Sequence, residues 1–512
     1  MVTWVGYPLP KMNKLNINKM KKTLSMIWTI ALTLSGIAIT NAQQVKVNTS
    51  RINKIDKYLN DGVENGFSGA VLIAKKGKPL LAKGYGMANK EDVVPYTTTT
   101  VSSIGSVTKQ FTATAILKLV ELNKLELTDS LDKFFKNLPE DKREITVHHL
   151  LTHTAGFIDV IGDGDFDDIP RDKFFKTVFS TELLHKPGTK YAYSNVGYSI
   201  LARIIEISSG QDYEKFLNLF LFKPAGMNKT GYFIPQWDEN KTATGYYSNT
   251  INVGTMISRF NKIGKVTWSL KGNGGIHSTI EDMYKWYQAL KNSTILSKEL
   301  FKKLTTPYIL EYEEQASYYA YGWVIYNSDR NTKIISHNGG NAIFFHDFIW
   351  LPKEDVLIIQ FTNASSREAE VAWTIEKMIF NEDFKPDLIK KSLNNLVLDN
   401  LETRNTKQIN ELILTIKEKY NSYLKYSENL NGLGYDVLRT NKNSKLAVAL
   451  FKLNTELFPE EGNIWDSLGE GYIADNQKEE AVKSYKKALE LAPKNDCNWC
   501  KSSKKALNEL KK

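Results

Sequence analysis

Two groups of strand-like segments, far apart along the chain, constrain the fold more than any other feature. The first is a predicted β-hairpin, in which residues 68–74 and 79–85 flank a glycine-containing turn. The second group consists of apolar or alternating runs bounded by turn residues, at 321–326, 333–336, 342–351 and 356–362. The long stretch between the groups is dominated by helical patterns. This order predicts one antiparallel sheet built from both ends of a domain, with a helical insertion between them.

Near the start of the central stretch, a serine and a lysine lie one helical turn apart. Ser106 and Lys109 precede residues 110–122, which are apolar on most sides and therefore predict a buried helix. Residues three apart on a helix share a face, so the Lys109 amine is expected beside the Ser106 hydroxyl. A lysine desolvated in a cleft can accept the proton of a serine at neutral pH. The pair predicts a nucleophilic serine at a helix N-terminus that favours a developing oxyanion.

The spacing alone is not specific, because Ser-x-x-Lys occurs four more times in this chain. The other copies lie in polar stretches, at Ser130/Lys133, Ser422/Lys425, Ser484/Lys487 and Ser502/Lys505. Ser106 also fits the simpler role of a helix N-cap. Two later motifs favour the catalytic interpretation.

These motifs are Tyr-Ser-Asn, from Tyr193 to Asn195, and His-Asn-Gly, from His337 to Gly339. Tyr193 follows a Pro-Gly turn and precedes a strongly periodic helical segment, which predicts a loop held by a rigid element. A tyrosine beside a lysine can relay a proton, and an asparagine amide can both donate to and accept from a substrate. The simpler roles are a packed aromatic ring for Tyr193 and a hairpin turn for the His-Asn-Gly segment.

In this order, the three motifs resemble those of the serine β-lactamase and penicillin-binding-protein superfamily, in its class C-like branch of peptidases and esterases. The similarity covers residues 60–381. It includes Leu-Leu-Thr-His-Thr-Ala-Gly at 150–156 and Gly-Asn-Gly-Gly-Ile-His-Ser-Thr at 272–279. The resemblance implies the fold that the strand order also predicts, an α+β domain with an antiparallel sheet flanked by helices and a helical insertion.

The resemblance also implies roles for individual residues. It makes Ser106 the acylated nucleophile, Lys109 and Tyr193 the proton-handling pair, Asn195, His337 and Gly339 substrate contacts, and the backbone N–H groups of Ser106 and Gly340 the oxyanion hole.

One position departs from the pattern of this branch. His337 stands where its β-lactamases usually have a lysine that attracts the carboxylate of a penicillin or cephalosporin. An imidazole with an unperturbed pKa of about 6.5 is only partly cationic at neutral pH, so that attraction is expected to be weaker.

These observations predict a serine hydrolase that forms an acyl-enzyme at Ser106 on a D-amino-acid peptide, a β-lactam or a carboxylic ester. A peptidase or esterase is favoured over a true β-lactamase. The alternative is a non-catalytic binder of cell-wall fragments. We predict no cofactor, and no metal site either: His149 and His153 are four residues apart, but the glutamate of His-Glu-x-x-His is absent.

The C-terminal part of the chain predicts helices. We divide the chain after the leader into a serine hydrolase domain at 43–385, a helical linker at 386–427, and helical repeats with a capping helix at 428–512. A tetratricopeptide-like pattern of two packed helices consists of Trp465, Leu468, Gly469, Tyr472, Ala481, Tyr485, Ala488 and Pro493. Such repeats predict a surface that binds a protein partner. Cys497 and Cys500 can form a small disulfide or remain a dithiol.

The N-terminal residues 1–42 are typical of a leader and signal peptide, with a basic start, an apolar core at 24–39 and a small-residue Thr-Asn-Ala end. We therefore expect export to the periplasm or the medium, and no membrane span after cleavage. The net charge of +10 is spread along the 512 residues, which favours an ordinary solvated surface over a nucleic-acid site.

Overall fold

In the computed structural model of this protein, the described residues are 49–510 except 163, 248, 313–314, 342, 365–369 and 494–496. The predicted leader and signal peptide lies outside these residues. Within them, no helix combines the length and the apolar character needed to cross a bilayer.

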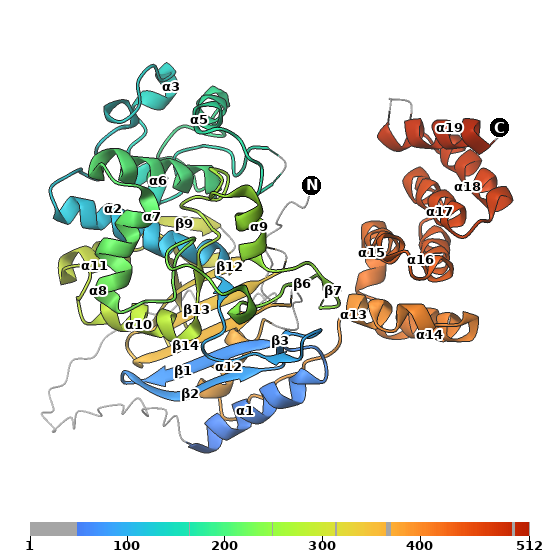
Figure 1. Cartoon of the computed structure of the whole chain (residues 1–512), viewed down its shortest axis with the longest axis horizontal. Coiled ribbons are helices and arrows are strands. Elements are labelled where there is room, and N and C mark those ends of the chain that lie inside the picture. The colour runs from blue at the N-terminus through green and yellow to red at the C-terminus, as the bar shows by residue number, and fades with distance from the viewer. Residues whose placement is uncertain are drawn as a thin grey trace, which may run out of the picture.

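Eight of the described strands form one antiparallel sheet with the order β2-β1-β14-β13-β12-β11-β10-β9 (Figure 1). These strands are β1 (Gly69–Lys75), β2 (Lys78–Tyr85), β9 (Ile309–Tyr312), β10 (Gln315–Tyr319), β11 (Val324–Asn327), β12 (Lys333–Gly340), β13 (Phe345–Leu351) and β14 (Val356–Thr362). Strand β1 pairs with β14, with Gly69 opposite Thr362, so the two ends of the domain meet inside the sheet. The predicted single sheet with a helical insertion is confirmed.

Both faces of the sheet are covered, which explains the nearly continuous apolar runs of its central strands. Successive side chains of a strand point to opposite faces. In β1, Ala70 and Leu72 belong to the large core under the helical insertion, whereas Val71 and Ile73 belong to a smaller core on the other face. Helices α1 (Thr49–Val63) and α12 (Ala372–Phe380) cover that second face (Figure 1).

The helical insertion lies over the first face of the sheet and contains the central helix α2 (Thr108–Glu121). Its other helices are α3 (Glu140–Arg143), α4 (Val147–Leu151), α5 (Arg171–Ser180), α6 (Asn195–Ser209), α7 (Tyr213–Leu217), α8 (Lys223–Ala225), α9 (Met256–Ile263), α10 (Ile280–Lys291) and α11 (Lys298–Leu304). Helix α2 is buried almost all round, as its composition predicts. Phe111 packs edge-on against Phe222 and Trp286, so this helix is fixed in the core.

Short strand pairs connect the insertion to the rest of the domain. They are β3 (Met87–Asn89) with β4 (Val94–Pro95), β5 (Ser102–Ser103) with β8 (His277–Ser278), and β6 (Tyr246–Tyr247) with β7 (Ile251–Asn252). The β5–β8 pair places residues 272–278 beside the segment that leads into α2, since Ser103 lies opposite His277.

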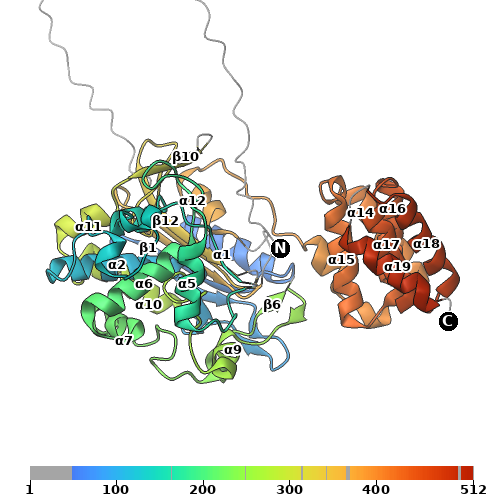
Figure 2. The same cartoon turned by 90° about the horizontal axis from the view of Figure 1, so that it is seen from above.

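The C-terminal region is helical throughout its described residues, as predicted, and stands beside the sheet domain in both views (Figures 1 and 2). Its helices are α13 (Leu393–Leu398), α14 (Thr406–Lys419), α15 (Ser427–Thr440), α16 (Ser444–Leu457), α17 (Gly462–Ala474), α18 (Lys478–Glu490) and α19 (Asn498–Leu510). They share a core of their own, against which Ile251 of β7 packs. Within it, Gly469 of α17 lies so close to the Tyr485 ring of α18 that a Cβ would approach it to 2.6 Å.

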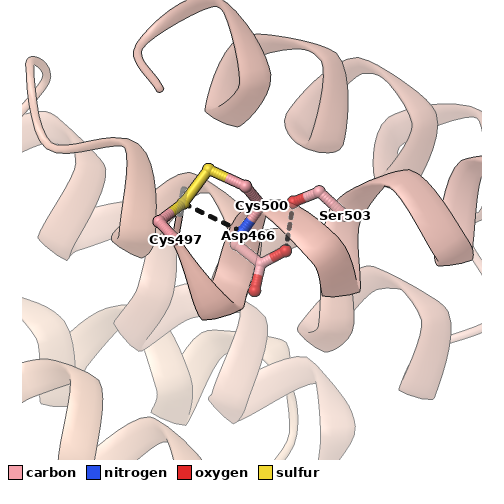
Figure 3. The surroundings of a disulfide bond; sticks show 4 residues. All are labelled: Asp466, Cys497, Cys500 and Ser503. Atoms are coloured by element: carbon pink, nitrogen blue, oxygen red, sulfur yellow. Dashed lines mark hydrogen bonds between the residues drawn. A yellow bond between two sulfur atoms is a disulfide. The ribbon is translucent and has the colours of Figure 1, made fainter. Parts of the chain in front are cut away.

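The two cysteines form a disulfide at the start of α19 (Figure 3). The Cys500 backbone N–H donates to the Cys497 sulfur at 3.1 Å. One turn further along α19, the Ser503 hydroxyl donates to the buried Asp466 of α17. Of the two states that the sequence leaves open, the structure contains the disulfide, which closes the turn that leads into the last described helix.

Candidate active site

Ser106 lies in a single 3-10 turn (Gly105–Val107) immediately before α2. Gly105 has a φ of 51°, a left-handed conformation that favours glycine. The N-cap residue of α2 is Val107, so Ser106 does not take the simple capping role. Its side chain is half-buried and points to Lys109, as the spacing predicts.

The Lys109 amine contacts three oxygen atoms. It lies 2.6 Å from Asn195 Oδ1, 2.8 Å from the Asn273 carbonyl oxygen and 3.3 Å from Ser106 Oγ. Its Nζ also lies 4.7 Å from the centre of the Tyr193 ring. These contacts bring together three separate segments of the chain, which carry Ser106 with Lys109, Tyr193 with Asn195, and Asn273.

The Lys109 side chain is completely buried, at 0% exposure. Burial lowers the pKa of Lys109 from its ordinary value to about 7, although the Asp159 and Asp165 carboxylates act in the opposite direction. A substantial fraction of this lysine is therefore a neutral amine at neutral pH. In that form it can take a proton from Ser106.

Tyr193 lies beside the Ser106–Lys109 pair. Its hydroxyl shares a hydrogen bond with Ser106, and burial raises the pKa of this phenol above its ordinary value. The phenol is therefore neutral at neutral pH and is not the first acceptor of the serine proton. It can instead donate a hydrogen bond and relay a proton to the departing group.

His153 holds the tyrosine in place, a role that the sequence did not predict. Its ring lies 4.3 Å from the Tyr193 ring, centre to centre, and its Nδ1 accepts the Ser194 backbone N–H at 3.0 Å. Burial, with the nearby Lys109, keeps the pKa of His153 well below its ordinary value. His153 lies beyond the end of α4, in a left-handed conformation with a φ of 57°. Among the described residues, no group of three or more His, Cys, Asp or Glu side chains is arranged to hold a metal ion.

Asn195 is the first residue of α6, and Asp159 fixes its amide. Asp159 Oδ1 accepts both the Asn195 backbone N–H and the side-chain Nδ2, each at 2.9 Å. The opposite end of the amide faces Lys109. The amide NH₂ has a second hydrogen, which is compatible with the substrate contact that the resemblance implies.

Strand β12 ends against the turn that carries Ser106. A Cβ on Gly339 would lie 2.1 Å from the Ile104 carbonyl oxygen and 2.7 Å from the Ser106 nitrogen. A Cβ on Gly105 would lie 2.7 Å from the Gly340 nitrogen. The two glycine segments thus approach closely at the backbone nitrogens of Ser106 and Gly340, which the resemblance assigns to the oxyanion hole.

His337 is in the middle of this strand, 4% exposed, and both of its ring nitrogens are engaged. Nδ1 lies 2.5 Å from the Asn338 carbonyl oxygen, which can only accept, so Nδ1 carries the hydrogen and Nε2 accepts from the Tyr319 hydroxyl at 3.1 Å. Burial, with the charge of Lys109, lowers the pKa of His337 to about 3. The ring is therefore neutral at pH 7, rather than partly cationic as its unperturbed pKa predicts.

This geometry agrees with the comparisons with known proteins. Residues 55–377 match the model of the Beta-lactamase family. The chain belongs to the beta-lactamase family. Penicillin-binding protein 4* of Bacillus subtilis is 30% identical over 293 residues, which are 54% of this chain and 64% of that protein. The chain thus spans less than two thirds of the length of this relative.

Two solved structures of this family have a similar fold. The octameric penicillin-binding protein homologue from Pyrococcus abyssi is 27% identical, with a TM-score of 0.56 over 64% of this chain and 76% of that one. The penicillin-binding protein from Bacillus halodurans is also 27% identical, with a TM-score of 0.55 over 63% of this chain and 99% of that one. Together with the family match over residues 55–377, these similarities support the assignment to a family of serine hydrolases.

Proposed function

We propose that this protein is an exported hydrolase that forms an acyl-enzyme at Ser106 and transfers the acyl group to water. The observation that carries this proposal is the contact between Ser106 and a fully buried Lys109, at 3.3 Å, with the lysine pKa lowered to about 7. A lysine whose pKa burial lowers this far, in contact with a serine hydroxyl, is the kind of perturbed group that clusters at functional sites.

In the proposed reaction, neutral Lys109 takes the Ser106 proton while Oγ forms a bond to the substrate carbonyl carbon. The carbonyl electrons move to the oxygen, where the N–H groups of Ser106 and Gly340 stabilise the negative charge. The leaving group departs with a proton supplied from Lys109 through Tyr193. A water molecule then attacks the ester in the same way and releases the acid and free Ser106.

We further propose that the substrate is a D-amino-acid peptide or a carboxylic ester rather than a β-lactam. Neutral His337 supplies no positive charge for the carboxylate of a penicillin. Among the described residues, the charged groups that act on the pKa values of Lys109, Tyr193 and His337 are three carboxylates and Lys109 itself. The carboxylates are those of Asp159, Asp165 and Glu311. A site of this charge disfavours substrates with a carboxylate near the reacting carbonyl, so among D-amino-acid peptides it favours those without a free carboxylate at that place.

A panel of substrates tests both parts of the proposal. We expect turnover of a chromogenic short-chain ester or a D-alanyl peptide, slower turnover of a chromogenic cephalosporin, and a mass increase on Ser106 in intact protein treated with a fluorescent penicillin. If the cephalosporin is the best substrate, the substrate assignment is wrong. If neither turnover nor an adduct is seen, the protein is instead the non-catalytic binder of cell-wall fragments.

The acylation rate is expected to fall with pH below about 7. Lys109 acts as a base only when it is neutral, and with a pKa of about 7 it becomes protonated as the pH decreases through this value. Above that pH the rate should reach a plateau until another group titrates. The kcat/KM for the best substrate, measured between about pH 5 and 9, should show a single acid limb with a tenfold loss per pH unit. A flat profile in this range would exclude Lys109 as the base.

Two further parts of the proposal concern the ends of the chain. Export to the periplasm or the medium is proposed from residues 1–42 alone. For the helices from α15 to α19, we propose tetratricopeptide-like repeats that bind a protein partner. The repeat pattern supports this, because Leu468, Tyr472, Ala481, Tyr485 and Ala488 are all buried between α17 and its neighbours.

A further inference from the structure

The Asn195 amide has two chemically different ends, and its neighbours determine which end faces Lys109. Asp159 presents a carboxylate, which can only accept, to the NH₂ end at 2.9 Å. The same carboxylate oxygen accepts the Asn195 backbone N–H at 2.9 Å, so Asp159 is anchored to the helix start as well as to the amide. The amide oxygen is thereby turned to Lys109 Nζ, at 2.6 Å.

The orientation of this amide decides where the Lys109 lone pair points. A neutral amine has two N–H donors and one lone pair. Asn195 Oδ1 and the Asn273 carbonyl oxygen both accept from Lys109, at 2.6 and 2.8 Å, and together they use both donors. The lone pair is left for the third neighbour, the hydroxyl of Ser106.

A reversed amide would undo this arrangement. Its NH₂ group would face Lys109 and donate a hydrogen bond to the lone pair of the amine. The lone pair would then point to Asn195 instead of Ser106. The Asn273 carbonyl cannot prevent the reversal, because it belongs to a different segment and contacts only the lysine end of the network. Among the described residues, Asp159 is the side chain that bonds the NH₂ end of the amide.

We propose that Asp159 is a positioning residue for acyl transfer: it anchors the NH₂ end of Asn195 and thereby aims the Lys109 lone pair at Ser106. The inference rests on the proposed function of this site. It gives a role to an exposed aspartate that none of the three motifs contains.

Asp159 also acts on Lys109 through its charge, which provides a separate readout. Two carboxylates, Asp159 and Asp165, raise the pKa of Lys109 against the larger effect of burial. Four other titratable groups surround the amine, and all are neutral at pH 7: His153, His337, Tyr193 and Tyr198. Removal of the Asp159 charge should therefore lower the pKa of Lys109 and move the acid limb of the rate to lower pH.

Two substitutions separate the two effects. Asp159→Asn keeps an oxygen that can accept from Asn195 but removes the charge, so we expect a plateau kcat within about threefold of the wild type and an acid limb at lower pH. Asp159→Ala removes the acceptor too, so we expect the plateau kcat for acylation to fall by about tenfold or more, with KM little changed. Asp172→Asn is the matched control, since Asp172 is an exposed aspartate of α5 paired with Arg171.

The measurement is the pH profile of acylation for each variant with the best substrate of the wild-type protein. Wild-type acid limbs and plateau rates in both Asp159 variants would overturn the inference, and so would a change in KM alone, which indicates a direct substrate contact. If Asp159→Ala does not fold, the acid limb of Asp159→Asn decides. A wild-type protein without any turnover would instead refute the proposed function, so the two failures are distinguishable.

Discussion

Lys109→Met is expected to slow acylation of Ser106 by roughly 10²- to 10⁴-fold, the usual contribution of a general base. Methionine has a similar length and suits a fully buried position, so the helix should keep its packing. The loss should arise because Ser106 would have no neighbour able to remove its proton, since the Tyr193 phenol is held neutral by its raised pKa. Single-turnover kinetics with a chromogenic ester report this step directly.

Two variants serve as controls for this experiment. Lys133→Met changes the lysine of the Ser130/Lys133 copy of the motif, which is 51% exposed and paired with Asp129, and should leave the rate unchanged. Ser106→Ala should abolish the covalent adduct altogether. Thermal unfolding should show that Lys109→Met is at least as stable as the wild type, because it removes a buried ionisable group. An acylation rate within about threefold of the wild type would rule out Lys109 as the base.

The contrast between predicted and missed strands has a physical reason. Strands β1, β13 and β14 are buried on both faces, so their apolar runs are visible in the sequence. Strand β9, at the edge of the sheet, and its neighbour β10 were not predicted. Strand β9 alternates between half-buried and exposed residues, and an edge of this kind carries only a weak hydrophobic signal.

The site shows a similar division between side-chain and backbone chemistry. Ser106, Lys109 and Asn195 belong to short motifs whose residue types the proposed reaction requires, and the structure brings them into contact. The Asn273 acceptor is a backbone carbonyl, which any residue could supply, so no sequence signal identifies it. Asp159 is 36 residues from Asn195, and only the fold places it beside the amide.

The charge of His337 also depends on the fold. An unperturbed pKa near 6.5 predicts a partly charged ring. Burial in β12, together with Lys109, lowers the pKa of His337 and keeps the ring neutral, although the hydrogen bond with the Asn338 carbonyl acts in the opposite direction. Burial of this kind depends on strands β10 to β13 together, and no local pattern reports it.

Gly339→Ala is expected to reduce acylation by roughly 10²- to 10³-fold, the usual effect of losing one oxyanion-hole donor. The added methyl would lie 2.1 Å from the Ile104 carbonyl oxygen and 2.9 Å from the Val107 nitrogen. Both are backbone atoms, which no rotamer change can move aside, so β12 and the Ser106 turn must separate. The N–H groups of Ser106 and Gly340 would then no longer converge on one oxygen, although Lys109 would still contact Ser106.

The Gly339 experiment can separate this effect from the loss of the base. Because Lys109 is untouched, the acid limb of Gly339→Ala should stay where it is in the wild type while the plateau falls, whereas Lys109→Met should abolish the limb. Gly432→Ala, at a site in α15 where a methyl meets no atom within 4 Å, should leave the activity unchanged. A wild-type plateau in Gly339→Ala would contradict the prediction: either the strand tolerates the methyl group, or the Gly340 N–H is not needed to stabilise the oxyanion. Circular dichroism and thermal unfolding should confirm that the sheet domain of the variant is still folded, since only then does a low plateau report on the geometry of the two N–H groups.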